Sequence, residues 1–285
     1  MKLGTNDIGS VYLGTNAVQK VYLGTNEVWS SYAYLLDDYS GAAAAYSLRK
    51  LRSGYTGSAI RVRRSSDNTE QDIGFVNNEL DTSSLTTFCS GTNGFVKTWY
   101  DQSGNGYDAT QSTASAQPQI VSSGSVITEN GKPTAQFDGI DDKFTSAFSL
   151  LSQPNTIFSV ATSKTSVLIG LLYDDDSGND RNTYDNRGDA FAGSPVMGSS
   201  TWVDNQQYLH SILYNGTNSF IYRNSNLISL TSLIGTQGLS GLTIGARFSG
   251  NFWNGTIQEL IVYNSNQSSN RTGISDNINN FYSIY

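Results

Sequence analysis

The stretch GFVKTWYDQSGNGYDATQS, residues 94–112, decides the fold class. Its first six residues predict a β-strand, and the glycines and asparagine that follow tolerate the backbone angles of tight turns. Short strands separated by turns continue from residue 118 to 262, as in TIFSVATS, YLHSILYNG and GTIQELIVY. The sequence therefore predicts a protein made mostly of β-strands.

The composition favours one large β-sandwich with a small appendage. The chain has 285 residues, of which only 14% are charged, and its formal net charge is −7. An acidic chain repels nucleic acid, and the one basic segment, RVRRSS at residues 61–66, has no flanking basic residues. We find no apolar window of 18 residues and no export signal, so we expect neither a membrane span nor ordinary secretion.

Cysteine and histidine each occur once, as Cys89 and His210. A single cysteine excludes a disulfide within the chain, and a single histidine excludes a zinc site with two histidines from one subunit. We expect a packed thiol and an imidazole at the surface or in the core. Catalysis by this pair would need an activating geometry that a sequence does not reveal.

The N-terminus repeats one phrase, because VYLGTNAVQK is followed by VYLGTNEVWS and preceded by a looser copy. Alternating side chains and GTN turns predict a small β-meander over residues 1–32, followed by the sandwich domain over residues 33–285. So short a meander cannot bury enough apolar surface to stand alone. Its apolar residues are therefore candidate anchoring residues: Tyr12, Val18, Tyr22, Val28 and Trp29.

Three short helices are expected. The first lies near residues 42–51, where four apolar residues fall at helical spacing: Ala44, Ala45, Leu48 and Leu51. The second follows Asp81, which we expect to act as its N-cap, and stops before Gly91. The last closes the chain and places three apolar residues on one face, packed on the sandwich: Ile274, Ile278 and Phe281.

Three phrases within residues 42–145 resemble the catalytic domain of the B-type α-L-arabinofuranosidases. They are AAYSLRKLRSGYTGSAIRVRRSSD, FCSGTNGFVKTWYDQSGNGYDATQ and VITENGKPTAQFDGIDD. The final third resembles laminin-G-like lectins, through LTIGARFSGNFWNGTIQELIVYN. The resemblance implies a mainly β fold, a concanavalin A-like jelly-roll β-sandwich with a few short helices.

The resembled family hydrolyses glycosides with retention, which requires two carboxyl groups about 5 Å apart. Its acid is an aspartate directly after an IGG strand end, whereas this chain has IGAR, with Arg247 in that place. Its nucleophile is a glutamate shortly after two adjacent cysteines, which this chain lacks, and no glutamate lies between Glu129 and Glu259. We therefore expect a domain that is not an enzyme.

An acidic run, YDDDSGND, lies near the missing nucleophile in the sequence. Three interpretations are open: a solvated loop, a calcium site, or a source of replacement carboxylates. For the calcium site, the candidate ligands are Asp174, Asp175, Asp176 and Asp180. No other cofactor is expected. The phrase YDQSGNGYD leaves similar alternatives, although in the family Asp101 resembles a scaffold residue that ties a turn to backbone amides. FDGIDDKF, residues 137–144, is likewise expected to organise a turn.

Aromatic residues with neighbouring amides and charges are the groups that bind sugars. Six residues in or beside predicted loops form a candidate glycan-binding face: Trp202, Tyr208, Arg247, Phe248, Phe252 and Trp253.

The tandem YLGTN phrase resembles the openings of bacteriophage virion proteins. We therefore expect a structural virion subunit, a head fibre, capsid decoration or tail-associated protein, assembled in the host cytoplasm. Its expected partners are other virion proteins, further copies in a homotrimer and a host or environmental glycan, with no nucleic acid and no membrane. The alternative is an arabinofuranosidase-like glycoside hydrolase with rearranged carboxylates.

Overall fold

The computed structural model describes residues 34–165, 169–176, 182–193, 202–228, 235–247 and 250–285, together with the backbone of short strands at residues 2–30 and 196–197. The N-terminal strands pair as three hairpins: β1 (Lys2–Leu3) with β2 (Asn6–Asp7), β3 (Val11–Leu13) with β4 (Asn16–Val18), and β5 (Lys20–Leu23) with β6 (Asn26–Ser30). No pairing joins one hairpin to another among these strands. The five predicted anchoring side chains lie outside the described residues.

The centre of the first sheet is β20 (Asn155–Ser163), which pairs with β25 (Gln207–Tyr214) on one side and β29 (Asn254–Tyr263) on the other. β26 (Phe220–Arg223) and β27 (Asn226–Ile228) extend this sheet beyond β25. β7 (Ala42–Ser47) and β18 (Ala135–Asp138) both pair with β29. All pairs are antiparallel.

The second sheet begins with β9 (Glu70–Ile73), β8 (Ile60–Arg64), β12 (Gly94–Trp99) and β13 (Ala109–Thr110). It continues through β19 (Phe144–Ser146), β28 (Leu242–Ile244), β21 (Leu171–Asp174), β22 (Thr183–Asp185), β23 (Ala190–Phe191) and β24 (Val196–Met197). β14 (Gln119–Ser122), which also pairs with β15 (Ser125–Val126), joins β12 to β18. Two smaller hairpins are β10 (Phe75–Val76) with β11 (Glu79–Leu80), and β16 (Thr128–Glu129) with β17 (Lys132–Pro133).

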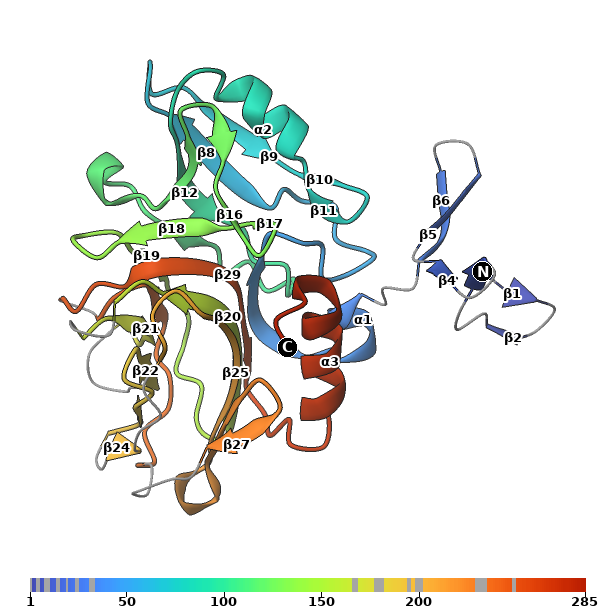
Figure 1. Ribbon diagram of the computed structural model, residues 1–285. Coiled ribbons are helices and arrows are strands. Elements are labelled where there is room, and N and C mark those ends of the chain that lie inside the picture. Colours follow the sequence, from blue (N-terminus) through green and yellow to red (C-terminus); the bar gives the residue numbers. More distant parts are fainter. Residues whose placement is uncertain are drawn as a thin grey trace.

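The central strands are buried on both faces. One face packs into a core that includes the large rings of Trp99, Phe137 and Phe144. The other face packs beneath α1 (Leu35–Asp38) and α3 (Arg271–Tyr282), as Figure 1 shows for α3. Every residue of β20 is buried, so exposure does not alternate along this strand as it does along a strand with one face in water. The predicted mainly β sandwich is confirmed.

The expected helix near residues 42–51 is wrong, because most of that segment is strand β7. Ala44 faces one core and Ala45 faces the other, and neither is exposed to solvent. A strand buried on both faces loses the polar alternation that identifies strands in sequence, so its alanines resembled a helix.

The other two predicted helices are confirmed. α2 (Thr82–Phe88) begins after Asp81, whose carboxylate accepts the backbone N–H of Ser84 at 2.9 Å. In α3, Ile274 and Ile278 are fully buried. The described residues also form the short helical turns η1 (Ala114–Ala116) and η2 (Gly216–Asn218). None of the described helices has the length and apolar character that a membrane span requires.

The turn after β12 confirms the scaffold interpretation of YDQSGNGYD. One oxygen of Asp101 accepts the backbone N–H groups of Ala45 and Ser103, each at 2.8 Å. The second oxygen accepts the Ser103 hydroxyl at 2.7 Å and the Tyr107 N–H at 3.1 Å. This carboxylate therefore ties the turn to β7.

Candidate functional site

A surface cavity of about 280 Å³ lies where β21 and the β22–β23 hairpin meet the loop between β28 and β29. Charged and amide side chains line it together with an apolar wall: Asp185, Arg187, Asp189, Arg247 and Asn251, with Ile169, Leu171, Thr183 and Phe191. Two carboxylates in one hollow are the minimum that acid–base chemistry on a glycosidic bond requires.

The hairpin turn DNRGD, residues 185–189, positions the charged groups. Asp185 Oδ1 accepts the backbone N–H of Arg187 at 2.9 Å and that of Asp189 at 3.1 Å. Gly188 adopts a φ of +85°, a conformation that glycine reaches without steric cost. The local sequence thus folds the turn around the Asp185 carboxylate, an arrangement typical of aspartate in turns.

Asn186 fastens this turn to the strand beside it. Its side-chain oxygen accepts the N–H of Gly170 at 3.2 Å, and its amide nitrogen donates to the Thr165 carbonyl at 2.7 Å. The backbone N–H of Asn186 also donates to the Gly170 carbonyl at 3.0 Å. Asn186 is only 2% exposed, so these bonds form away from water and hold the charged turn in one place.

Arg187 contacts both carboxylates. Its Nε and Nη2 donate to Asp185 Oδ2 at 2.9 and 2.7 Å, and Nη2 lies 3.4 Å from Asp189 Oδ2. Because both oxygens contact one nitrogen, at 2.7 and 3.4 Å, they cannot be more than 6.1 Å apart. Retaining glycosidases hold their carboxyl groups at roughly 5–5.5 Å and inverting enzymes at about 6.5–9.5 Å.

The two aspartates have different environments. Asp185 accepts four hydrogen bonds, two from backbone N–H groups and two from the guanidinium of Arg187. Burial raises the pKa of Asp189, and the negative charge of Asp185 raises it further, while Arg187 opposes both effects. Asp189 is also the more exposed side chain of the two, at 19% against 7%. The two carboxyl groups therefore differ in hydrogen bonding and in exposure.

Arg247 follows β28 at the edge of the same cavity. Its backbone pairs with Gly250 in both directions, at 2.8 and 3.3 Å. The side chain is exposed and forms no ion pair within the part of the chain that the structure describes. Among the described members of the predicted glycan-binding face, Arg247 is the one that lines this cavity.

The remaining aromatic predictions are corrected. Trp202, Tyr208 and Trp253 are at most 5% exposed, and Trp202 stacks 4.5 Å from His210 inside the core. A ring in the core has no face left for a sugar, so these three do not form an exposed binding surface. Phe252 is half-buried, and Phe248 lies outside the described residues.

The acidic run 174–180 does not contribute to the cavity through its described members. Asp174 and Asp175 are fully buried, Asp176 is half-buried, and Asp180 lies outside the described residues. The suggestion that this run supplies replacement carboxylates stays a prediction, although none of its described members lines the cavity that contains Asp185 and Asp189. Calcium binding by the run stays a prediction.

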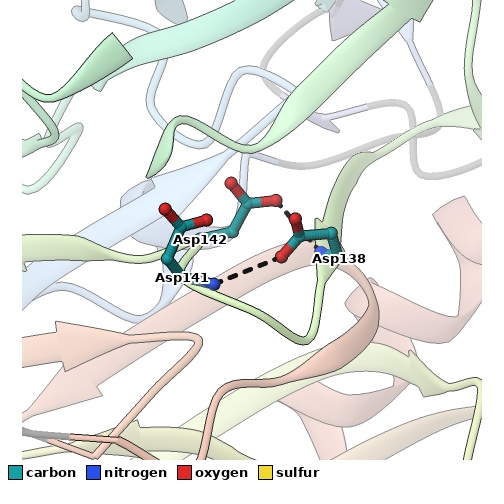
Figure 2. Close-up of side chains that lie close together, drawn as sticks. All are labelled: Asp138, Asp141 and Asp142. Carbon is teal, nitrogen blue, oxygen red and sulfur yellow. Dashed lines mark hydrogen bonds between the residues drawn. The ribbon is translucent and has the colours of Figure 1, made fainter. Parts of the chain in front are cut away.

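A separate group of three carboxylates is formed by Asp138, Asp141 and Asp142, whose ligand atoms lie within 4.8 Å of one another (Figure 2). The predicted turn is confirmed, since Asp138 Oδ1 accepts the N–H of Ile140 at 2.8 Å and Asp142 Oδ2 accepts the N–H of Asp138 at 3.0 Å. Burial, followed by the charges of Asp138 and Asp141, raises the pKa of Asp142 to about 7. The cluster thus organises the turn between β18 and β19.

Two other hollows formed by described residues offer no pair of carboxylates that is available in this way. A larger one, of about 710 Å³, contains Glu79 and Asp81, but Lys132 pairs with Glu79 at 3.1 Å and Asp81 caps α2. A third, of about 460 Å³ beside Tyr55, has no carboxylate among its lining residues.

Sequence reasoning missed Asp185 and Asp189. The available signal was two aspartates flanking an Asn-Arg-Gly turn, a pattern that favours a tight hairpin with both carboxylates at its base. The sequence has no glutamate near the position of the family nucleophile, and Asp185 and Asp189 differ from that nucleophile in residue type.

Comparison with known proteins places the fold. The family model for the catalytic domain of α-L-arabinofuranosidase B matches residues 37–165. A GH54 α-L-arabinofuranosidase soaked with a cyclic sulfate inhibitor superposes over 86% of the chain with a TM-score of 0.66 and 16% identity. The chain shares that enzyme's β-sandwich fold. An arabinofuranosidase complexed with arabinofuranosyl-α-1,2-xylobiose superposes over the same share, with a TM-score of 0.61 and 16% identity.

The chain spans 64% of the length of these two enzymes. The matched segment 37–165 ends before the first residue of the cavity, so it contains the scaffold and none of the cavity's charged groups. No curated protein matches the chain in sequence.

These findings overturn the expectation of a structural virion protein that is not an enzyme. The family model that matches residues 37–165 describes a catalytic domain, and the superposed structures are arabinofuranosidases. The non-catalytic interpretation is therefore wrong. The match also excludes the N-terminal repeat, on which the phage resemblance depended. The error arose from treating the loss of two family motifs as the loss of every usable carboxylate pair.

Proposed function

We propose that the protein is a glycoside hydrolase of the α-L-arabinofuranosidase type, with Asp189 as its acid and Asp185 as its charged partner. The observation that carries this proposal is the pair of carboxylates held by Arg187 in a cavity of about 280 Å³. The arabinofuranosidase fold supports it.

The roles follow from the environments of the two side chains. Burial and the charge of Asp185 raise the pKa of Asp189, which favours its protonated form, and its greater exposure lets it reach a leaving group. Asp185 is fixed by its four hydrogen bonds, so it presents negative charge toward the developing oxocarbenium ion without reorganising. Arg187 contacts both carboxylates and holds them at a fixed separation.

In the first step, Asp189 donates its proton to the glycosidic oxygen while the bond from that oxygen to the anomeric carbon breaks. An oxygen of Asp185 forms the new bond to the anomeric carbon. In the second step, Asp189, now a carboxylate, takes a proton from water, and the water oxygen displaces Asp185 from the anomeric carbon. Each bond that forms replaces one that breaks, and the enzyme returns to its starting state.

The limit of 6.1 Å on the carboxylate separation lies below the inverting range of roughly 6.5–9.5 Å. We therefore expect retention of anomeric configuration. Proton NMR of the sugar released early in the reaction measures it directly, and an initially inverted product would contradict the assignment of Asp185.

The test compares two leaving groups. 4-Nitrophenol departs without a proton, whereas a sugar alcohol needs one. We expect Asp189→Asn to lower the hydrolysis of arabinofuranosyl xylobiose about 10²- to 10⁴-fold, the usual contribution of general acid catalysis, and to lower that of 4-nitrophenyl α-L-arabinofuranoside much less. Asp185→Asn should abolish both reactions.

Asp204→Asn is the matched control, because Asp204 is exposed and does not line the cavity. It should retain the wild-type rates on both substrates. The proposal fails if the wild-type protein releases no sugar, or if both cavity variants stay as active as the control.

A further inference from the structure

The hollow of about 460 Å³ beside Tyr55 lies at the β10–β11 hairpin, and it is here called the hairpin cavity. Its walls come from residues 55–58, in the loop that leads into β8, and from residues 74–78 of the hairpin. It shares no lining residue with the cavity that contains Asp185 and Asp189, and Figure 1 shows β10 and β11 far from β21 and β22. The hairpin cavity is therefore a separate place on the surface.

Two aromatic side chains form a corner of the hairpin cavity. The rings of Tyr55 and Phe75 are half-buried, their centroids lie 6.3 Å apart, and their planes meet at 75°. The Tyr55 hydroxyl donates to the Ser58 carbonyl at 2.9 Å. Gly57 leaves room for this ring, because a Cβ at residue 57 would lie 2.7 Å from Tyr55 Cζ. The local sequence thus fixes the Tyr55 ring before any ligand binds.

Backbone hydrogen bonds hold the walls of the hairpin cavity together. The Ala59 N–H donates to the Ile73 carbonyl at 2.8 Å, which joins the loop to β9. The Lys50 N–H donates to the Asn78 carbonyl at 2.9 Å, and the Tyr34 hydroxyl donates to Asn78 Oδ1 at 2.6 Å. A ligand that enters walls fixed in this way has little protein motion to restrict, which lowers the cost of binding.

The polar groups of the hairpin cavity are hydroxyls, amides and one ammonium group. They belong to Lys50, Thr56, Ser58, Asn77 and Asn78. Groups of these kinds hydrogen-bond to the hydroxyls of a sugar, while an aromatic ring packs against the apolar C–H face of the sugar ring. The combination of an aromatic corner with uncharged polar groups therefore favours a carbohydrate ligand.

A second hollow adjoins the hairpin cavity. Asn77 lines both the hairpin cavity and the larger cavity of about 710 Å³, so the two meet at the hairpin turn. Each volume lies within the usual range of ligand pockets, roughly 300–1,000 Å³. A ligand that occupies both is consequently longer than one sugar unit.

The charges around the two hollows favour a neutral ligand. Lys50 is the one charged residue among the described residues that line the hairpin cavity, and its Nζ already lies 5.7 Å from the centre of the Tyr34 ring. In the larger cavity, Lys132 pairs with Glu79 at 3.1 Å, and Asp81 adds a further carboxylate. The two lysines and the two carboxylates balance, so neither an anion nor a cation is attracted to the pair of hollows as a whole.

We propose that the two cavities at the β10–β11 hairpin bind a chain of a neutral polysaccharide, with one sugar ring against Tyr55 and Phe75 and the next units crossing the hairpin turn. The binding itself is independent of the proposed function. Its role rests on that function: the site tethers a polymer whose side branches the cavity with Asp185 and Asp189 hydrolyses.

The experiment is an NMR titration with three unbranched probes: xylohexaose, xylobiose and the anionic hexagalacturonate. Dissociation constants are measured for the wild type, for Tyr55→Ala, which removes the ring, and for Tyr55→Phe, which keeps the ring and loses the bond to Ser58. Tyr285→Ala is the matched control, because Tyr285 is 46% exposed and lines none of the three cavities.

We expect xylohexaose to bind more tightly than xylobiose, because it spans both cavities, and more tightly than hexagalacturonate. Tyr55→Ala should weaken the binding of xylohexaose about 2- to 10-fold, the usual contribution of an aromatic contact, whereas Tyr55→Phe should keep most of the affinity and Tyr285→Ala all of it. In the wild type, the amide signals that shift should belong to residues 55–58 and 74–78, a result that does not depend on the folding of any variant.

Three outcomes overturn the inference: shifts confined to other residues, equal affinities for xylohexaose and xylobiose, or tighter binding of hexagalacturonate. Hydrolysis of 4-nitrophenyl α-L-arabinofuranoside and of arabinofuranosyl xylobiose by the wild type is measured on the same preparation. Hydrolysis without binding of xylohexaose overturns this inference and leaves the proposed function standing. Binding of xylohexaose at the hairpin without hydrolysis of either substrate overturns the proposed function and leaves the polysaccharide site standing.

Discussion

Replacing Arg187 by glutamine tests the link between the ion pairs and the acid. The guanidinium is the one group that lowers the pKa of Asp189, against burial and the charge of Asp185. Its removal should therefore raise that pKa. Asp185 also loses its partner, and its less compensated charge pushes the pKa of Asp189 in the same direction.

The size of the change follows from the geometry. Arg187 Nη2 lies 3.4 Å from Asp189 Oδ2, and the Arg187 side chain is 47% exposed, so a dielectric constant near that of water applies. Two unit charges at this distance then interact by about 1.2 kcal/mol. Since one pKa unit corresponds to 1.36 kcal/mol, the pKa of Asp189 should rise by about one unit.

The assay is the pH dependence of kcat/KM on arabinofuranosyl xylobiose, whose leaving group needs the proton. An acid must be protonated to act, so activity declines above its pKa, and the alkaline limb of Arg187→Gln should lie about one pH unit higher than that of the wild type. Arg187→Lys should shift the limb less, because it retains the charge. A carboxyl-detected NMR titration of Asp189 gives the same result without substrate. A limb that stays in place or moves to lower pH would refute the reasoning.

Three further outcomes concern stability. The fold raises the pKa of Asp142 to about 7, whereas an unfolded aspartate has a pKa near ~4. Its contribution to the free energy of unfolding is therefore fully present below about pH 4 and is lost as the pH rises through 7, by at most about 4 kcal/mol. Asp142→Asn should remove this loss when urea unfolding is compared at pH 5 and pH 8. Asn186→Ala removes the side-chain hydrogen bonds to Gly170 and Thr165 and should cost about 2 kcal/mol in the same assay, with lower activity because the charged turn is released. Arg49 Nε lies 2.8 Å from the buried carboxylate of Glu259. Arg49→Met leaves that carboxylate without a counter-charge and should lower the free energy of unfolding by about 3–5 kcal/mol. A double variant that also replaces Glu259 by leucine should recover most of that loss. Equal losses in the single and double variants would contradict the last of these.

Features set by neighbouring residues could be predicted from the sequence. Asp81 caps α2 because its carboxylate reaches an N–H three residues ahead, and Asp138 closes its turn across two residues. The spacing of Ile274 and Ile278 likewise identified the closing helix, since helical periodicity is a local property.

The candidate site could be predicted only in part. Arg247 was singled out as a candidate glycan-binding residue; it lines the cavity, and its role in binding stays a prediction. Trp202 and Trp253 were assigned to an exposed face because aromatic rings in polar loops resemble sugar-binding residues. Their burial depends on which distant strands cover them, and a sequence contains no direct record of that.

The sequence by itself determined that the chain is a β-sandwich with one helix capped by Asp81 and with aspartate-organised turns, because strand patterning and turn chemistry act over a few residues. Only the tertiary structure decided that Ala44 and Ala45 lie in a strand between two cores, and that Asp185, Asp189 and Arg247 share one cavity. Arg247 lies 58 residues beyond Asp189 in the chain, and the two meet because β28 pairs with β21, which in turn pairs with β22. The order of strands in a sheet is fixed by long-range packing, and for that reason the chemistry of this site became visible only in the folded protein.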